Sequence, residues 1–154
     1  MTTEHLLREL ADRAELTDLV ARHGRWIDEG RWDETDQIFT PDVTTRSPRG
    51  EAHGFDELLA LVRRGHDRFE RTVHFKSNLV IDLDGDTASV RINDLAVFVV
   101  DDANVSFAAG TARYEARHTE NGWRFSSLEI APATLTESVA RADIAAVVAS
   151  ADRS

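Results

Sequence analysis

The sequence predicts an α+β fold, with helices in the first half of the chain and an antiparallel sheet in the second. Apolar residues recur every three or four positions over 3–29 and again over 55–66, which is the period of an amphipathic helix. From residue 72 onward apolar and polar residues alternate, as they do in a half-buried strand. Two dipeptides that favour tight hairpins, Asp84-Gly85 and Asn121-Gly122, divide this second half into pairs of strands.

The first half contains three predicted helices. Gly30 follows the first one, in the position where a glycine commonly ends a helix. Pro41 closes the second, because proline cannot continue a helix. The predicted elements are helices over Thr3–Glu29, Trp32–Phe39 and Phe55–His66, a short strand over 41–48 and a polar loop over 50–54.

The second half contains four predicted strands and a last helix. Thr134-Leu135-Thr136-Glu137 has the form of a capping box, so the last helix is expected to begin there. We therefore expect a single domain over residues 1–133, followed by a C-terminal helix and tail over 134–154. Helices gathered on one face of a twisted sheet leave a conical cavity between the layers, where small-molecule sites tend to lie. The predicted strands are Thr72–Leu83, Thr87–Val100, Val105–His118 and Trp123–Ala131.

Composition excludes several classes of partner and chemistry. The 154 residues include 28 Asp and Glu against 18 Lys and Arg, a net charge of -10, which disfavours nucleic acid and anionic lipid as partners. The chain has no cysteine, so it has no disulfide or thiolate chemistry. Neither a signal peptide nor an apolar stretch long enough to span a membrane is present. The expected location is cytoplasmic.

Several segments resemble SnoaL-like domains of the nuclear-transport-factor-2-like (NTF2-like) superfamily. The resemblance covers about Leu6 to Ala131 and is nearest to the scytalone dehydratase, bile-acid 7α-dehydratase and polyketide cyclase branches. It implies a cone-shaped α+β barrel, with three N-terminal helices packed on a curved, mainly antiparallel sheet and with a C-terminal helix. The segments that carry it are Ile27-Asp28-Glu29-Gly30-Arg31-Trp32-Asp33-Glu34, Phe39-Thr40-Pro41-Asp42-Val43, His74-x-x-x-Asn78, Asp84-Gly85-Asp86-Thr87-Ala88 and Asn121-Gly122-Trp123-Arg124-Phe125.

The resemblance implies a catalytic pair of His74 and Asp28. His74 matches the pocket histidine of the dehydratases, and Asp28 matches the aspartate near the end of their first helix. An imidazole can take a proton from carbon and return it to a leaving hydroxyl, while a carboxylate holds its tautomer. From spacing alone, a solvated carboxylate at a helix end is the more common outcome for Asp28. Strand alternation also places Asn78 on the face of His74, so Asn78 is expected to donate a hydrogen bond to a substrate oxygen.

Asp94 is a third candidate catalytic residue. It shares the parity of Val90, Ile92, Ala96 and Phe98, and a carboxyl group among apolar side chains has the desolvation that a general acid or base requires. The alternative is that Asp94 is wet, at a sheet edge or at a bulge near Asn93 and Leu95.

Four further residues are candidates for the substrate pocket. His23 lies on the inner stripe of the first helix, where a core histidine satisfied by one hydrogen bond is the common outcome. Tyr114 has small neighbours that leave room for its hydroxyl. Trp26 and Phe98 are more typical of a core, although they also suit a cavity wall. No phosphate loop, nucleotide fingerprint or His-Glu-x-x-His pattern occurs, so neither a cofactor nor a metal is expected.

These residues together predict a cofactor-independent acid–base enzyme. It would be a dehydratase, isomerase or cyclase acting on a hydrophobic, oxygenated, ring-containing or polyketide-like small molecule. The alternative is a non-catalytic ligand-binding or assembly domain, similar to the small subunits of ring-hydroxylating dioxygenases, with its cavity filled by Trp26, Phe98 and Tyr114. The resemblance also implies a homodimer through the outer face of the sheet. The strand face that the helices cannot cover is an independent reason to expect one, and it includes Leu95, Val97 and Val99.

Overall fold

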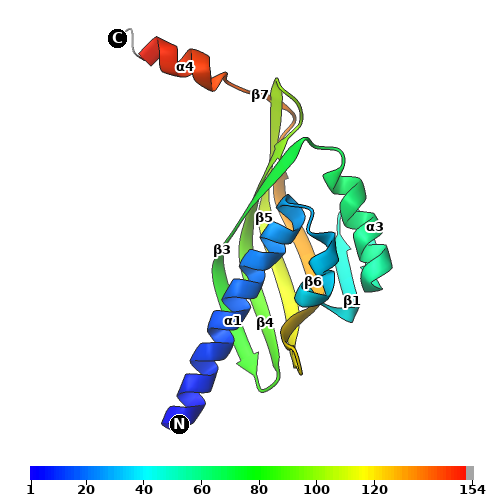
Figure 1. The fold of residues 1–154 in the computed structure, drawn as a ribbon, viewed down its shortest axis with the longest axis vertical. Coiled ribbons are helices and arrows are strands. Elements are labelled where there is room, and N and C mark those ends of the chain that lie inside the picture. The colour runs from blue at the N-terminus through cyan, green and yellow to red at the C-terminus, as the bar shows by residue number, and fades with distance from the viewer. Residues whose placement is uncertain (152–154) are drawn as a thin grey trace.

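The N-terminal helix α1 runs diagonally across one face of a curved sheet (Figure 1). The structure is a computed structural model that describes residues 1–151. Over these residues the sheet has seven strands in the order β2-β1-β6-β5-β4-β3, with the short β7 paired to β5. β1 is parallel to β6, and the other pairings are antiparallel. The elements are α1 (Thr3–Asp28), a 3-10 turn (Trp32–Glu34), α2 (Thr35–Ile38), β1 (Phe39–Ser47), β2 (Gly50–His53), α3 (Gly54–His66), β3 (Arg71–Asp84), β4 (Thr87–Val99), β5 (Asn104–Thr119), β6 (Gly122–Leu135), β7 (Val139–Ala140) and α4 (Ile144–Ala151).

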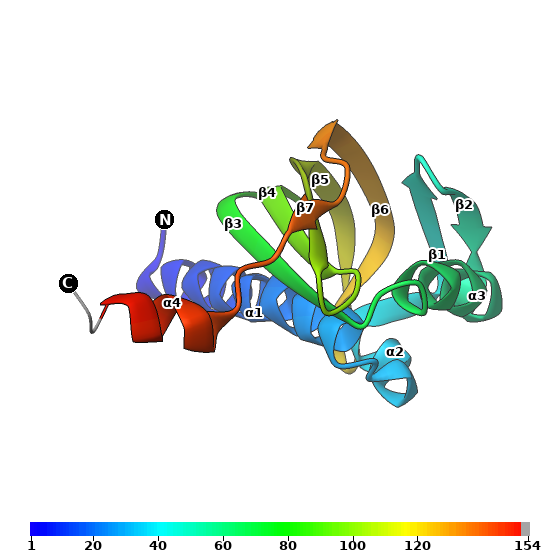
Figure 2. The same ribbon diagram turned by 90° about the horizontal axis from the view of Figure 1, so that it is seen from above.

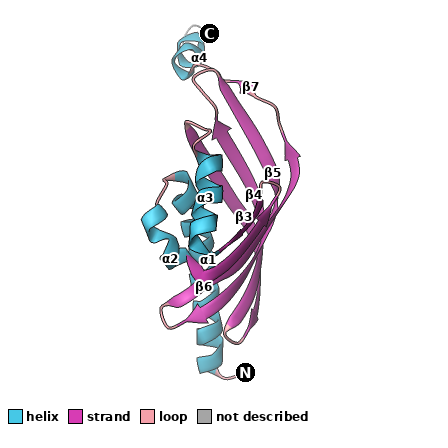
Figure 3. Cartoon of the chain, turned by 90° about the vertical axis from the view of Figure 1, so that its right-hand side faces the viewer, coloured by secondary structure: helices cyan, strands magenta, loops and turns pink. Residues whose placement is uncertain are grey.

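The predicted α+β class is confirmed. α1, α2 and α3 lie on one side of the sheet, with α3 beside β1 and β2 (Figures 2 and 3). The four long strands of the second half occur within a few residues of their predicted bounds. The sheet does not close into a barrel, because β2 and β3 form its two edges.

The predicted organisation between residues 32 and 54 is wrong in two places. The second helix ends at Ile38, and Phe39 already pairs with Phe125 at the start of a strand. Residues 50–53, expected as a loop, form β2 and pair with β1, with Arg46 opposite Glu51. Neither segment has enough periodicity to predict these pairings, because Phe39 pairs with a strand distant in the sequence and β2 is only four residues long.

The capping-box interpretation of residues 134–137 is also wrong. β6 continues to Leu135, and the Thr136 hydroxyl accepts a hydrogen bond from the Phe107 backbone N–H at 2.9 Å. The first residues of β5 form backbone hydrogen bonds with this segment, with Ala109 opposite Thr134 and Ala108 opposite Leu135. This strand pairing outweighs the local preference for a helix cap. The helix begins ten residues later, at Ile144, and Figure 1 shows it beyond the end of the sheet. Residues 152–154 of the predicted tail lie outside the described residues.

The hydrophobic core fills the space between α1 and the sheet. Leu16 and Val20 of α1 join Val90 and Ile92 of β4 in one buried cluster. Trp123 of β6 fixes the position of the helix, because its ring N–H donates to Asp12 and its backbone N–H donates to the Glu15 carboxylate, both at 2.9 Å. None of the helices within residues 1–151 has both the length and the apolar character that crossing a bilayer requires.

A bulge in β3 changes which residues of that strand face the helix. Between Ser77 and Val80 the strand contains one more residue than its partner β4, and Asn78 has a φ of 55°. Before the bulge, His74 and Lys76 face α1; after it, Leu79 and the odd-numbered residues that follow do so. The extra residue reverses the alternation, so the expectation that Asn78 shares a face with His74 is wrong.

Candidate active site

Asp28 and His74 are in direct contact. Asp28 is the last residue of α1, and its carboxylate accepts three hydrogen bonds from β3. The His74 ring nitrogen Nδ1 lies 2.6 Å from Oδ1, the His74 backbone N–H donates to Oδ2 at 2.9 Å, and the Thr72 hydroxyl donates to Oδ1 at 2.9 Å. The helix end and the edge strand are therefore joined through one carboxylate.

The contacts around Asp28 keep it ionised. Burial alone would raise the pKa of Asp28, but the hydrogen bonds from His74 and Thr72 outweigh it and lower that pKa below its ordinary value. A carboxylate can only accept, so Nδ1 of His74 carries the hydrogen and the lone pair of the neutral ring lies on Nε2. The arrangement provides an oriented base, with side chains that are 12% and 20% exposed for His74 and Asp28.

A cleft of about 480 Å³ lies between α1 and β3, at the position of this pair. Its helix wall includes Ala21 and Gly24, whose small size leaves the strand accessible. Its strand wall includes both faces of β3, because β3 is the edge of the sheet. The lining residues are Val20, Ala21, Gly24, Arg25, Asp28, Glu29, His74, Phe75, Lys76 and Ser77.

A second ionisable pair, Lys76 and Asp94, lies beside the first. The two residues are directly opposite each other across β3 and β4, and Nζ lies 2.8 Å from Oδ2. Their side chains are only 5% and 13% exposed. Asp94 therefore faces inward, as its parity predicts, and the bulge lies on β3 instead of on its own strand. The sequence analysis did not anticipate its salt-bridge partner.

Tyr114 and His23 extend this pair into the core. The Tyr114 hydroxyl lies 2.8 Å from Nδ1 of His23, and both residues are buried. Burial alone would lower the pKa of Lys76, but Tyr114 and Asp94 outweigh it and raise that pKa, which keeps the ammonium charged. The Tyr114 hydroxyl is close enough to Lys76 to contribute to this raised pKa, and its own hydrogen-bond partner is Nδ1 of His23. Burial lowers the pKa of His23 well below its ordinary value, with a smaller contribution from Lys76.

The other predicted pocket residues have different surroundings. Trp26 is buried in the core, where its ring N–H donates to the Thr35 hydroxyl at 3.1 Å. Phe98 is 7% exposed and lies edge-on to His74, with ring centroids 6.2 Å apart. Asn78 is exposed at the bulge and does not line the cleft. Phe98 therefore adjoins the His74–Asp28 pair, whereas Trp26 supports the fold.

Lys76 is the residue that sequence reasoning missed. It shares the parity of His74 on the same strand, and this is the signal that would have found it. From sequence alone, a lysine in such a strand is usually interpreted as an exposed residue of a sheet edge, because its long side chain can reach solvent from either face. The Lys76 side chain turns inward because Asp94 of β4 and Tyr114 of β5 lie within its reach inside the protein, and only the tertiary structure shows this.

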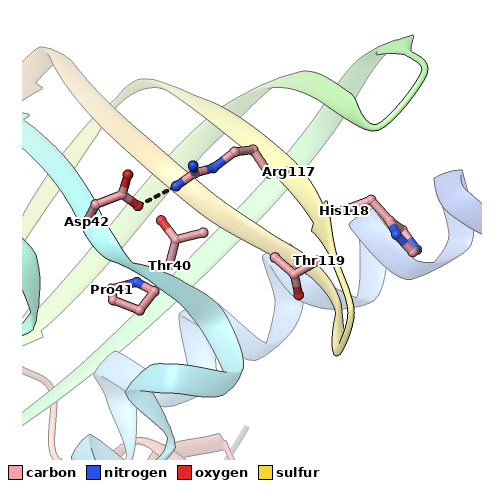
Figure 4. A pocket seen from close by; sticks show the side chains of 6 residues that line it. All are labelled: Thr40, Pro41, Asp42, Arg117, His118 and Thr119. Carbon is pink, nitrogen blue, oxygen red and sulfur yellow. Dashed lines mark hydrogen bonds and ion pairs between the residues drawn. The ribbon is translucent and has the colours of Figure 1, made fainter.

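A separate hollow of about 490 Å³ lies between β1 and β5 (Figure 4). Arg117 and Asp42 form an ion pair across it, with Thr40, Pro41, His118 and Thr119 completing the wall. Both charged side chains are largely exposed, and surface pairs of this kind contribute little to stability. None of the predicted catalytic residues lines this hollow. Over the described part of the chain, no three His, Asp or Glu side chains converge as metal ligands.

Comparisons with known proteins agree with this architecture. Residues 8–129 match the family model of a SnoaL-like domain. An uncharacterized protein of Mycobacterium tuberculosis is 30% identical over 121 residues, which cover 75% of this chain and 82% of that protein. A Novosphingobium aromaticivorans protein provisionally named a scytalone dehydratase superimposes with a TM-score of 0.77, at 20% identity, over 87% of this chain and 92% of its own.

A second structural neighbour is the hexachlorocyclohexane dehydrochlorinase LinA-type3 of Novosphingobium barchaimii. It superimposes with a TM-score of 0.76, at 22% identity, over 90% of this chain and 95% of its own. At these identities the two superpositions show a shared fold. The match of the family model over most of the chain decides membership: this protein belongs to the SnoaL-like domain family of the NTF2-like superfamily.

Proposed function

We propose that the protein is a cofactor-independent acid–base enzyme, a dehydratase, isomerase or cyclase that acts on a hydrophobic, oxygenated, ring-containing or polyketide-like small molecule. The observation that carries the proposal is the 2.6 Å contact between Nδ1 of His74 and Oδ1 of Asp28. It leaves Nε2 of His74 as a base with a fixed orientation. The cleft between α1 and β3 gives a small molecule access to the pair.

In the elimination form of this chemistry, Nε2 of His74 removes a proton from the carbon beside a carbonyl group. The electron pair of that C–H bond forms the carbon–carbon double bond, and the hydroxyl on the next carbon leaves. The imidazolium, held by the Asp28 carboxylate, returns its proton to the departing oxygen, so that water is released. Isomerisation uses the same two proton transfers without loss of water.

The names of the two structural neighbours support the elimination form. One is provisionally named a dehydratase and the other is a dehydrochlorinase, and these names describe elimination of water and of hydrogen chloride, respectively. Lys76 and Asp94 belong to the proposal as a pair, because the structure gives Asp94 an ammonium partner within the site.

The experiment is to replace His74 by Ala and by Gln and to assay both variants on cyclic β-hydroxy ketones. The appearance of the conjugated enone is followed by its ultraviolet absorbance. We expect turnover to fall by about 100-fold or more in both variants, since general acid–base catalysis contributes this much. His118→Ala, a histidine outside the cleft, is the matched control. Wild-type turnover in a folded His74→Ala variant would rule out the proposal.

The non-catalytic alternative has one observation in its favour. Trp26 and Tyr114 are fully buried and Phe98 nearly so, and these are the aromatic residues that would fill the cavity of a scaffold. A scaffold has no need of an oriented His74–Asp28 pair, which is why we favour the enzyme. The absence of turnover on every tested ketone, with unchanged binding of ring compounds after His74→Ala, would favour the scaffold.

We also propose a homodimer through the outer face of the sheet. Four apolar side chains are exposed there, which soluble monomers rarely gather in one patch. Phe75 is 54% exposed, Leu95 42%, Val73 38% and Phe107 36%. Leu95 pairs directly with Phe75, and Val97 pairs with both Val73 and Phe107, so these residues form one surface across three strands.

A further inference from the structure

The Lys76–Asp94 pair has more hydrogen-bonding capacity than the protein uses. Asp94 Oδ1 is buried and, within residues 1–151, has no hydrogen-bond partner. Over the same residues the hydrogen bond given for the Lys76 ammonium goes to Asp94 Oδ2, at 2.8 Å. A carboxylate oxygen without a donor therefore lies beside an ammonium that has further N–H bonds to donate. Buried polar groups are almost always satisfied, so a bound group is expected to complete this pair.

Two neighbours of Asp94 on the inner face of the sheet are small, whereas Ile92, two positions earlier on β4, is large and buried. Gly110 stands opposite Asp94 on β5, and Ala96 follows two positions later on β4. Gly110 has no side chain, and the place that a Cβ would take is occupied by the backbone of residues 131–133. On the β3 side, Lys76 lines the same cleft as His74. A ligand that enters this cleft thus meets the ammonium of Lys76 next to the catalytic histidine.

Charge decides which ligand group fits. The ammonium and the carboxylate neutralise each other, so the pair has no net charge to attract an ion. The other basic side chain of the cleft, Arg25, lies 3.6 Å from Glu34 and is already paired. The cleft also contains two carboxylates, Asp28 and Glu29, which oppose an anionic ligand. A hydroxyl is the smallest uncharged substrate group that both accepts from Lys76 and donates to Asp94.

We propose that the Lys76–Asp94 pair is a subsite that binds an uncharged hydroxyl group of the substrate. His74 and Lys76 are two residues apart on one strand face, which places them roughly 6.6 Å apart along the strand. This spacing is comparable to the width of a six-membered ring. The substrate then has a hydroxyl on the far side of a ring from the carbon that reacts at His74. The part that concerns the reacting carbon rests on the proposed function, whereas hydroxyl binding does not.

The test uses three probes with the same ring: cyclohexanol, cyclohexanecarboxylate and cyclohexylammonium. Each is titrated into the full-length wild-type protein while the backbone amides of Lys76, Asp94 and Gly110 are followed by NMR. We expect cyclohexanol to shift these amides and to bind at least about tenfold more tightly than either charged probe, the effect of about one net hydrogen bond. Equal or tighter binding of the carboxylate, or no shift with cyclohexanol up to its solubility limit, would overturn the subsite.

A variant pair separates the subsite from general effects. Because one unpaired buried charge can prevent folding, both charges are removed together in Lys76→Met/Asp94→Leu. We expect its affinity for cyclohexanol to fall about tenfold. The matched control is Arg113→Gln/Glu115→Gln, which removes an exposed ion pair from the opposite face of the sheet and should bind as the wild type does. Wild-type affinity in the first double variant would contradict the assignment.

His74→Ala distinguishes the two proposals. If both are correct, this variant loses turnover and still binds cyclohexanol. Lost turnover with no preference for cyclohexanol in the wild type would refute the subsite alone. Normal turnover with retained preference for cyclohexanol would refute the role of His74 alone.

Discussion

Nδ1 of His74 lies 2.6 Å from Oδ1 of Asp28, although the two residues are 46 positions apart in the sequence. The contact joins the last residue of α1 to the edge strand β3. It therefore couples the docking of a helix to the orientation of the His74 imidazole.

Asp28→Asn is expected to lower turnover by about 100-fold or more, because the amide stabilises neither the tautomer nor the imidazolium. It should also cost stability. The lowered pKa of Asp28 stabilises the fold fully above its ordinary value of 3.8, and this contribution is lost as the pH falls through the lower folded value. The stability difference between wild type and variant, measured by urea unfolding, should shrink below about pH 3.8. An unchanged difference at acidic pH would contradict this account.

His23→Asn tests the buried neutral histidine. Because the pKa of His23 is lowered from 6.5, the unfolded chain binds a proton below pH 6.5 that the folded protein does not. Wild-type stability should therefore fall as the pH drops below this value, by at most about 1.4 kcal/mol per pH unit from this residue. The variant, which keeps a hydrogen-bonding group for the Tyr114 hydroxyl, should show a shallower slope. Equal slopes in urea unfolding across this range would argue against a neutral His23.

Lys76→Met should destabilise the protein by about 3–5 kcal/mol, because it leaves the Asp94 carboxylate buried without its counterion. Lys76→Met/Asp94→Leu should recover most of this loss, since two apolar residues replace the pair without an unmatched charge. Urea unfolding of both variants is the measurement. If the double variant were as unstable as the single one, the pair would not be compensating the burial of its charges.

Asn78→Gly should leave stability and turnover close to those of the wild type, because glycine adopts the φ of 55° without strain. Asn78→Val should cost about 1–2 kcal/mol, since a β-branched residue is strained in this left-handed conformation. Unfolding and the enone assay give both quantities. A large loss of turnover in the glycine variant would instead favour the substrate contact that alternation predicted for Asn78.

Leu95→Asp places a charge at the centre of the exposed outer face of the sheet. We expect the wild type to be a dimer and this variant a monomer by light scattering at micromolar concentration, because a buried unpaired carboxylate opposes association. Asp82→Lys, on the neighbouring edge strand β3 and beyond its bulge, is a surface control that should remain dimeric. A monomeric wild type would contradict the homodimer.

The sequence predicted the secondary structure correctly wherever the local residue pattern and the final fold agree. The helical period over residues 3–29 predicted α1 to within a residue, and the Asp-Gly and Asn-Gly turns located both long hairpins. The parity of Asp94 along β4 predicted its inward orientation. The pairing of Asp28 with His74 came from a family resemblance, because no spacing in the chain indicates it.

Only the tertiary structure determined the conformation at places where pairing with a distant strand opposes the local preference of the sequence. The extra residue at Asn78 reverses the alternation of β3, so Asn78 leaves the face of His74 while Lys76 remains on it. The end of β5 pairs with residues 134–136 and prevents the helix that their capping box predicted. In both cases the register of a neighbouring strand determines the outcome. Register is a property of two segments together, and neither segment contains it alone.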